Sequence, residues 1–90
     1  MAYVKDKLVF LHTHEGTFQV PMTLSKLMEL LDPDDFLQVH RQYVVNIHAV
    51  DKVIPWFHGS YVIRVKDSPD SEIPVSRKHM QALRLALGIT

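Results

Sequence analysis

One arginine, Arg41, limits how residues 36–46 can fold. The sequence of this segment is FLQVHRQYVVN. As one continuous strand, its side chains would alternate between two faces, and Arg41 would stand in the same apolar row as Val39 and Tyr43. A guanidinium in such a row is either buried and paired, or the strand breaks and directs it outward. The alternation alone leaves both arrangements open.

The first part of the chain has the pattern of a β-hairpin. The run KLVFLHT at 7–13 is rich in β-branched and aromatic residues, and Gly16 supplies a turn. In TFQVPM at 17–22, apolar and polar side chains then alternate. We therefore expect two antiparallel strands joined near Gly16.

The second part of the chain is also mostly β. Short apolar runs alternate there with turn residues at short intervals, which favours small antiparallel sheets. The expected strands are FLQV at 36–39, a strand resuming at 43, AVDKVIPWF at 49–57, YVIRVK at 61–66 and EIPV at 72–75. Turns or loops are expected at 58–60 and, in the polar stretch DSPDS, at 67–71.

Two segments have the helical period instead. In the first, at about 24–31, apolar residues recur three and four positions apart, and Thr23 is suited to be the N-cap. In the second, at about 77–87, Ser76 is the expected N-cap and Gly88 lies where a glycine commonly ends a helix. The second helix carries an apolar stripe that we expect to pack on the sheet: Met80, Leu83 and Leu87.

Length and composition indicate one globular domain over residues 1–90. Hydrophobic residues make up 47% of the chain and charged residues 22%, which argues against intrinsic disorder. The absence of cysteine excludes disulfides and thiolate metal sites. No apolar run approaches the roughly 18 residues of a membrane span, and MAYVKDK is not a signal peptide. We expect a soluble, cytoplasmic domain.

The charge is balanced overall but unevenly distributed. Ten basic and ten acidic residues give a net charge of zero. Residues 1–39 contain three basic and six acidic residues, whereas residues 40–90 contain seven basic and four acidic ones. A polyanionic partner would therefore meet one part of the surface, not a generally basic domain.

No pattern in the chain indicates catalysis or a bound cofactor. The three glycines are isolated, so a phosphate-binding loop is not expected, and no nucleophile is paired with a base. His12 and His14 could face one side of a strand and hold Zn²⁺ or Cu²⁺, but the remaining histidines lack ligand spacing. We expect a non-enzymatic protein without a metal site.

Two arginines, Arg41 and Arg77, each follow directly on an apolar strand. They lie in VHRQYVV and PVSRKHM. Held on turns by a rigid sheet, both could contact guanine edges or phosphates of a nucleic acid. Equally, each could form a surface ion pair of little energetic weight. The last helix could also read a major groove, but no partner helix precedes it, so we favour its packing on the sheet.

Three stretches together resemble the LytTR family of DNA-binding domains of bacterial transcription regulators. They are FLQVHRQYVVNIHAVDKVI, the turn in WFHGSYVIRVKD, and IPVSRKHMQALRLALG. FLHTHEGTFQVPMTLSKLMELL resembles the hairpin and short helix of the same family. The resemblance covers about residues 8–88. The family commonly has a serine where this chain has Gln42 and more strand before LVFL, which leaves open that the N-terminal strands are cut short.

The resemblance implies a mostly β, elongated arrangement of small antiparallel sheets that contacts DNA through turns inserted into successive major grooves. It also resolves the misfit at Arg41: the strand ends near Val39, the HRQ segment turns, and the guanidinium points outward. Arg41 and Arg77 would be the direct DNA contacts. Supporting contacts are expected from Lys78, His40 and Lys5, the last in a turn with Asp6 and Lys7.

The expected partner is double-stranded DNA, with paired direct repeats as the typical target of the family. Domains of this family usually follow a phospho-receiver or sensor module, which these 90 residues do not encode. We expect the isolated domain to be monomeric and to act as the output domain of a two-component response regulator. The alternative is a non-enzymatic protein-interaction domain that docks partners through strand edges or the last helix.

Overall fold

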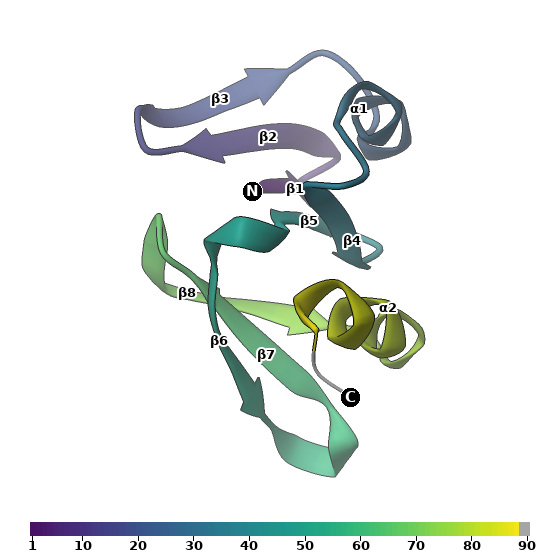
Figure 1. The fold of residues 1–90 in the computed structure, drawn as a ribbon. Coiled ribbons are helices and arrows are strands. Elements are labelled where there is room, and N and C mark those ends of the chain that lie inside the picture. The colour runs from purple at the N-terminus through teal and green to yellow at the C-terminus, as the bar shows by residue number, and fades with distance from the viewer. Residues whose placement is uncertain (89–90) are drawn as a thin grey trace.

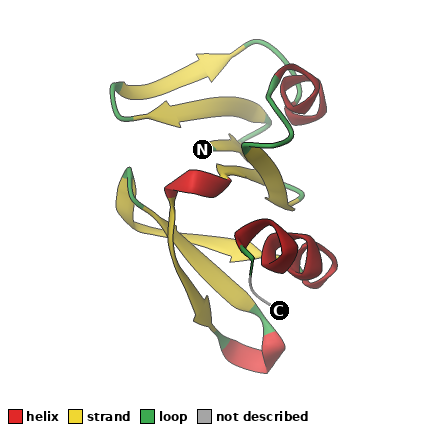
Figure 2. Ribbon diagram, viewed as in Figure 1, coloured by secondary structure: helices red, strands yellow, loops and turns green. Residues whose placement is uncertain are grey.

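The chain folds into two small antiparallel β-sheets and two α-helices, as expected (Figures 1 and 2). A computed structural model describes residues 1–88. The strands are β1 (Ala2–Lys5), β2 (Leu8–Thr13), β3 (Gly16–Val20), β4 (Phe36–His40), β5 (Tyr43–Asn46), β6 (Val50–Pro55), β7 (Tyr61–Val65) and β8 (Ser68–Val75). The helices are α1 (Leu24–Leu30) and α2 (Arg77–Leu87), with single 3₁₀ turns at Ile47–Ala49 and Phe57–Gly59.

The two sheets are built from consecutive hairpins with one rearrangement of strand order. The larger sheet has the order β3-β2-β1-β5-β4, and the smaller one has the order β6-β7-β8. All neighbouring strands are antiparallel. The described residues extend over 36 × 26 × 22 Å, with α1 at one end of the long direction and the β6–β7 hairpin at the other (Figure 1).

Two adjacent valines in β5 face opposite sides of the larger sheet. Both Val44 and Val45 are fully buried. Val44 belongs to a core with Leu24 and Leu27 of α1, whereas Val45 packs in a second core that includes Leu83 of α2. Because side chains alternate along a strand, β5 contributes to both cores at once.

Both helices begin and end close to the predicted positions. The Thr23 hydroxyl caps α1 by accepting a hydrogen bond from the Lys26 amide at 3.1 Å. Gly88 ends α2 in the left-handed region with φ 74°, where glycine is favoured. Ser76 stands at the N-cap position of α2, but its hydroxyl makes no capping bond. It is 2.5 Å from Nδ1 of His79 instead.

The sequence patterns missed one strand and the start of another. Residues 2–5 form β1 in the centre of the larger sheet, where no strand was expected. The predicted loop at 67–71 is wrong from Ser68 onward, because Ser68–Ser71 already belong to β8. This strand contains Pro69 and Pro74, which it tolerates because it lies at the edge of the smaller sheet.

The turn proposed to resolve the Arg41 misfit is confirmed. β4 ends at His40, β5 begins at Tyr43, and the two residues are paired across the turn. A register shift between Gln38 and His40 marks a bulge just before the turn. Bulges bend a strand and redirect side chains, and Arg41 is exposed. Among the described helices, none is long and apolar enough to span a membrane.

Leu83 and Leu85 provide a matched test of the packing of α2. Leu83 is 0% exposed and Leu85 is 71% exposed, although they are two residues apart on one helix. We expect Leu83→Ala to lower the free energy of unfolding by about 2–5 kcal/mol, because it leaves a cavity in the core. Leu85→Ala should change it by less than about 0.5 kcal/mol. Urea denaturation followed by circular dichroism measures both values, and equal effects would contradict this packing.

Candidate nucleic-acid interface

Main-chain hydrogen bonds join the predicted contact segments into one row. The amide of Val4, next to Lys5, donates to the carbonyl of Gln42 at 3.0 Å. The amide of Ser76, next to Arg77, donates to the carbonyl of Val39 at 2.9 Å. The β1–β2 turn, the β4–β5 turn and the start of α2 are therefore neighbours, although they are far apart in sequence.

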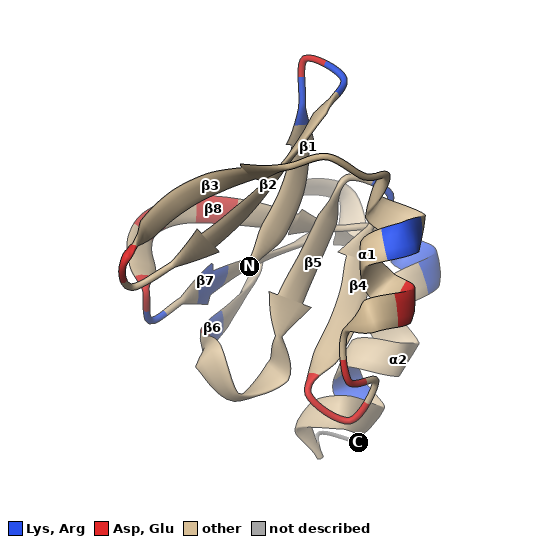
Figure 3. Ribbon diagram, turned by 90° about the horizontal axis from the view of Figure 1, so that it is seen from above, with Lys and Arg blue, Asp and Glu red and all other residues tan. Residues whose placement is uncertain are grey.

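The β1–β2 turn projects from the larger sheet, as Figure 3 shows. It is a two-residue turn, because Lys5 pairs with Leu8. Asp6 and Lys7 have φ angles of 53° and 66°, which is the left-handed conformation of a type I′ turn. This conformation costs a non-glycine residue about 1–2 kcal/mol. Strain of this kind at an exposed tip is commonly associated with function.

The β4–β5 turn is held from inside and leaves its arginine exposed. Nδ1 of His40 accepts a hydrogen bond from the Gln42 amide at 3.1 Å. The Gln38 side-chain amide donates to the Arg41 carbonyl at 3.4 Å. Within residues 1–88, the Arg41 guanidinium makes neither a hydrogen bond nor an ion pair. Its main chain is thus braced while its side chain stays available to a ligand.

At the start of α2, the two predicted basic residues differ in their contacts. Lys78 is exposed, as expected for a residue that could meet a phosphate. Arg77 is also exposed, but its Nη2 donates to the main-chain carbonyl of His58 at 2.6 Å. The β6–β7 loop therefore belongs to the same surface.

The strand predicted over 49–57 is too long, because β6 ends at Pro55 and the loop begins at Trp56, not at the expected turn at 58–60. The loop contains two exposed aromatic residues, Trp56 at 47% and Phe57 at 70%, whose rings meet edge to face with centroids 5.4 Å apart. The signal available in the sequence was the pair of adjacent aromatic residues directly before the expected turn, in WFHG. The proximity of this loop to Arg77 depends on how α2 packs and could not be predicted from the spacing of residues in the sequence.

Two histidines lie between the arginine-bearing turns. Burial, and then the neighbouring Arg41 cation, lower the pKa of His40 from its ordinary value. Burial also lowers the pKa of His79, followed by the charges of Lys78 and His40. The charge of His40 thus contributes to the lowered pKa of His79, which places the β4–β5 turn and the start of α2 within electrostatic reach of each other.

The surface made by these segments is basic although the domain is neutral. The β1–β2 turn with Lys5 before it, the β4–β5 turn and the start of α2 carry one acidic residue, Asp6. They carry five basic ones: Lys5, Lys7, Arg41, Arg77 and Lys78. In Figure 3, acidic residues gather elsewhere, on the β2–β3 and β7–β8 turns and in the segment that joins α1 to β4. The field of a locally basic surface persists over about 8–10 Å at physiological salt.

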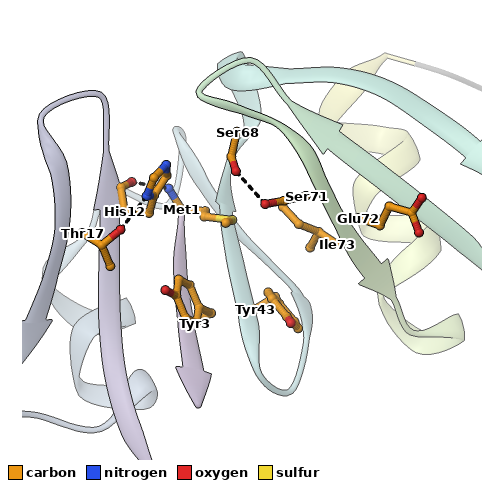
Figure 4. A pocket seen from close by; sticks show the side chains of 9 residues that line it. All are labelled: Met1, Tyr3, His12, Thr17, Tyr43, Ser68, Ser71, Glu72 and Ile73. Carbon is orange, nitrogen blue, oxygen red and sulfur yellow. Dashed lines mark hydrogen bonds between the residues drawn. The ribbon is translucent and has the colours of Figure 1, made fainter.

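A separate cleft between the two sheets contains none of the predicted contact residues (Figure 4). Its volume is about 410 Å³. Four of its polar side chains form two hydrogen-bonded pairs, His12 with Thr17 at 2.8 Å and Ser68 with Ser71 at 2.6 Å, and Tyr3, Tyr43 and Glu72 also line it.

The histidine pair considered as a metal site is not arranged as a strand pair. His12 lies in β2, whereas His14 lies in the turn after it, 3.7 Å from the Glu15 carboxylate. Among residues 1–88, no group of three or more histidine and acidic side chains gathers closely enough to hold a metal ion.

Comparison with known proteins gives one consistent family. A family model described as the LytTr DNA-binding domain matches residues 1–88. The transcriptional regulatory protein YpdB of Escherichia coli K12 is 32% identical over 83 residues, covering 92% of this chain and 34% of YpdB. The sensory transduction protein LytT of Bacillus subtilis 168 is 35% identical over 88 residues, covering 98% of this chain and 36% of LytT.

The fold agrees with these matches. A solved LytTr DNA-binding domain from Bacillus cereus superimposes with a TM-score of 0.84 at 25% identity, covering 98% of this chain and 79% of that one. The chain spans about a third of the length of the two regulators. Sequence and architecture therefore agree, and the chain belongs to the LytTr family of DNA-binding domains.

Proposed function

We propose that this domain binds double-stranded DNA sequence-specifically by inserting its basic turns into successive major grooves. The observation that carries the proposal is the row of turns tied together by main-chain hydrogen bonds, with Arg41 and Arg77 on neighbouring members of it. Arginine side chains contact guanine bidentately in the major groove, which gives base discrimination. Lys5, His40 and Lys78 flank the two arginines and supply backbone contacts.

The physical advantage of this arrangement is rigidity. Each turn is closed by strand pairing or by the start of a helix, so the contact residues lose little main-chain entropy on binding. With few basic residues in the row, non-specific attraction to DNA phosphates is modest. Specificity then depends mainly on the base contacts of the two arginines.

The proposal extends to the longer protein in which the domain acts. The domain acts without catalysis as the output domain of a cytoplasmic bacterial response regulator, joined in the longer protein to a receiver or sensor module. The relatives YpdB and LytT are described as a transcriptional regulatory protein and a sensory transduction protein, respectively, which supports this setting. We further propose that the isolated domain is monomeric and that paired direct repeats in DNA bring two copies together.

Arg41 and Arg77 are the residues whose removal tests base recognition. After selection of a target from random DNA, Arg41→Ala and Arg77→Ala should each lower discrimination at one base position by about 1–3 kcal/mol. Arg64→Ala is the matched control, because Arg64 lies in β7, outside the basic turns, and its Nη2 pairs with the Glu72 carboxylate at 3.5 Å. Gel shifts with single-base variants of the target measure the effect. Unchanged binding by both variants at all salt concentrations would sink the proposal.

Lys78 is expected to act differently from the arginines. As a phosphate contact, it carries no base information, so Lys78→Ala should weaken binding to all sequences by a similar factor. The slope of log K against log salt should become shallower by about one. Fluorescence anisotropy at several salt concentrations measures both quantities. A selective loss at one base position would show instead that Lys78 reads sequence.

DNA affinity should rise as the pH falls from about 7.5 to about 5.5. The lowered pKa values of His40 and His79 keep both imidazoles neutral at the higher pH, and protonation adds positive charge beside the DNA phosphates. The double variant His40→Gln, His79→Gln should flatten this dependence. Anisotropy titrations across the pH range test it, and an equally steep slope in the double variant would contradict it.

The same shifts affect folding with a defined sign. Because both folded-state pKa values lie below the unfolded value of 6.5, the unfolded chain takes up protons first. The contribution of His40 and His79 to the free energy of unfolding is complete above pH 6.5. It is lost as the pH falls through their folded-state pKa values. Circular dichroism at each pH therefore accompanies the titrations, so that only the folded domain is compared.

A further inference from the structure

The Arg77 guanidinium is already engaged by the protein itself. Its Nη2 donates to the His58 carbonyl at 2.6 Å, across the space between α2 and the β6–β7 loop. Gly59 lines the same space, and a Cβ built on it would lie 3.9 Å from Nη2 of Arg77. The guanidinium therefore lies against the main chain of the loop instead of extending freely into solvent.

The loop backbone adopts an uncommon conformation at this contact. His58 has φ 56° and ψ 36°, the left-handed region that non-glycine residues seldom enter, and Gly59 follows with φ 76°. The loop is closed by the Trp56 amide donating to the Ser60 carbonyl at 2.9 Å. Residues in this region cost about 1–2 kcal/mol and persist where the surroundings hold them.

The contact leaves Arg77 able to recognise a base. A planar guanidinium has five N–H donors and presents two edges, each with a pair of parallel N–H bonds. One edge consists of the Nε hydrogen and one hydrogen on Nη2, and the other consists of a hydrogen on Nη1 and the second hydrogen on Nη2. One hydrogen given to the His58 carbonyl thus leaves the other edge complete for a bidentate contact.

A second arginine ties the opposite part of α2 independently. Arg84 Nη2 is 3.2 Å from the Tyr61 hydroxyl, and its guanidinium lies over the Tyr61 ring at 5.7 Å. Together with the burial of Leu83 in the core that both sheets form, this contact keeps α2 in place. A change in the loop tip can therefore release Arg77 without releasing the helix.

We infer that the β6–β7 loop is a positioning element for DNA recognition, in which the left-handed His58 presents its carbonyl to fix the guanidinium of Arg77. This inference rests on the proposed function and assigns a role to a residue that need not touch DNA. Fixing the side chain in advance removes the entropy cost of immobilising a flexible arginine on binding. The acceptor is a main-chain atom, so the role depends on the backbone of His58 and not on its imidazole.

His58→Pro and His58→Asn form a matched pair that separates backbone from side chain. Proline cannot adopt a positive φ, so His58→Pro moves the carbonyl, whereas asparagine tolerates the left-handed region and keeps it. We expect His58→Pro to weaken binding to the selected target about three- to tenfold and to lower discrimination at the Arg77 base. His58→Asn should bind like the unmodified domain. Both are combined with Arg77→Ala in a double-mutant cycle.

A measurement without DNA tests the contact directly. The ¹H–¹⁵N heteronuclear NOE of the Arg77 Nε should be high in the unmodified domain and in His58→Asn. In His58→Pro it should fall to the value of the unpaired Arg41. If His58→Pro prevents folding, as judged by circular dichroism, replacement of Phe57–Gly59 by a two-residue Asn-Gly turn removes the carbonyl while closing the hairpin.

The outcomes separate this inference from the proposed function. Strong, Arg77-dependent DNA binding that His58→Pro leaves intact would overturn the positioning role alone. So would an equal loss caused by His58→Pro in the Arg77→Ala background, because the loop would then contact DNA itself. An Arg77 Nε as mobile as that of Arg41 in the unmodified domain would also overturn it. Failure of the unmodified domain to select any DNA sequence would overturn both.

Discussion

The pair of buried valines in β5 is the constraint on which the rest of this structure depends. Val44 and Val45 are fully buried on opposite faces of β5, so this four-residue strand contributes to the core under α1 and to the core under α2. A shift of β5 by one residue would exchange the two faces and disturb both cores. The register of β5 is therefore strongly determined, and with it the position of the turn that precedes Tyr43.

A rigid β5 explains how a neutral domain can present an ordered basic surface. The turn before it carries Arg41, β1 beside it leads to the turn with Lys5, and β4 accepts the hydrogen bond from Ser76 that locates Arg77. Each basic side chain is thus attached to the same sheet through main-chain contacts. Such pre-organisation gains specificity from few charges, because less conformational entropy is lost on binding.

Local patterns predicted much of this architecture. The β2–β3 hairpin, both helices and the turn at 41–42 have strong local signals, namely alternation, caps and a misplaced charge. β1 was missed because it is four residues long and its turn, Asp6–Lys7, contains neither glycine, asparagine nor proline. The start of β8 was missed because Pro69 in a polar stretch is typical of a loop, and only its edge position makes it acceptable in a strand.

The sequence by itself determined which residues could serve a DNA-binding surface: exposed arginines and lysines at strand and helix ends, with the family patterns around them. It also determined the class of fold, because side-chain period and turn residues act over a few positions. Only the tertiary structure decided that these segments are neighbours and that Arg77 lies against the His58 carbonyl. These hydrogen bonds join residues 19 to 38 positions apart in the sequence, and they exist only once both cores have formed around β5.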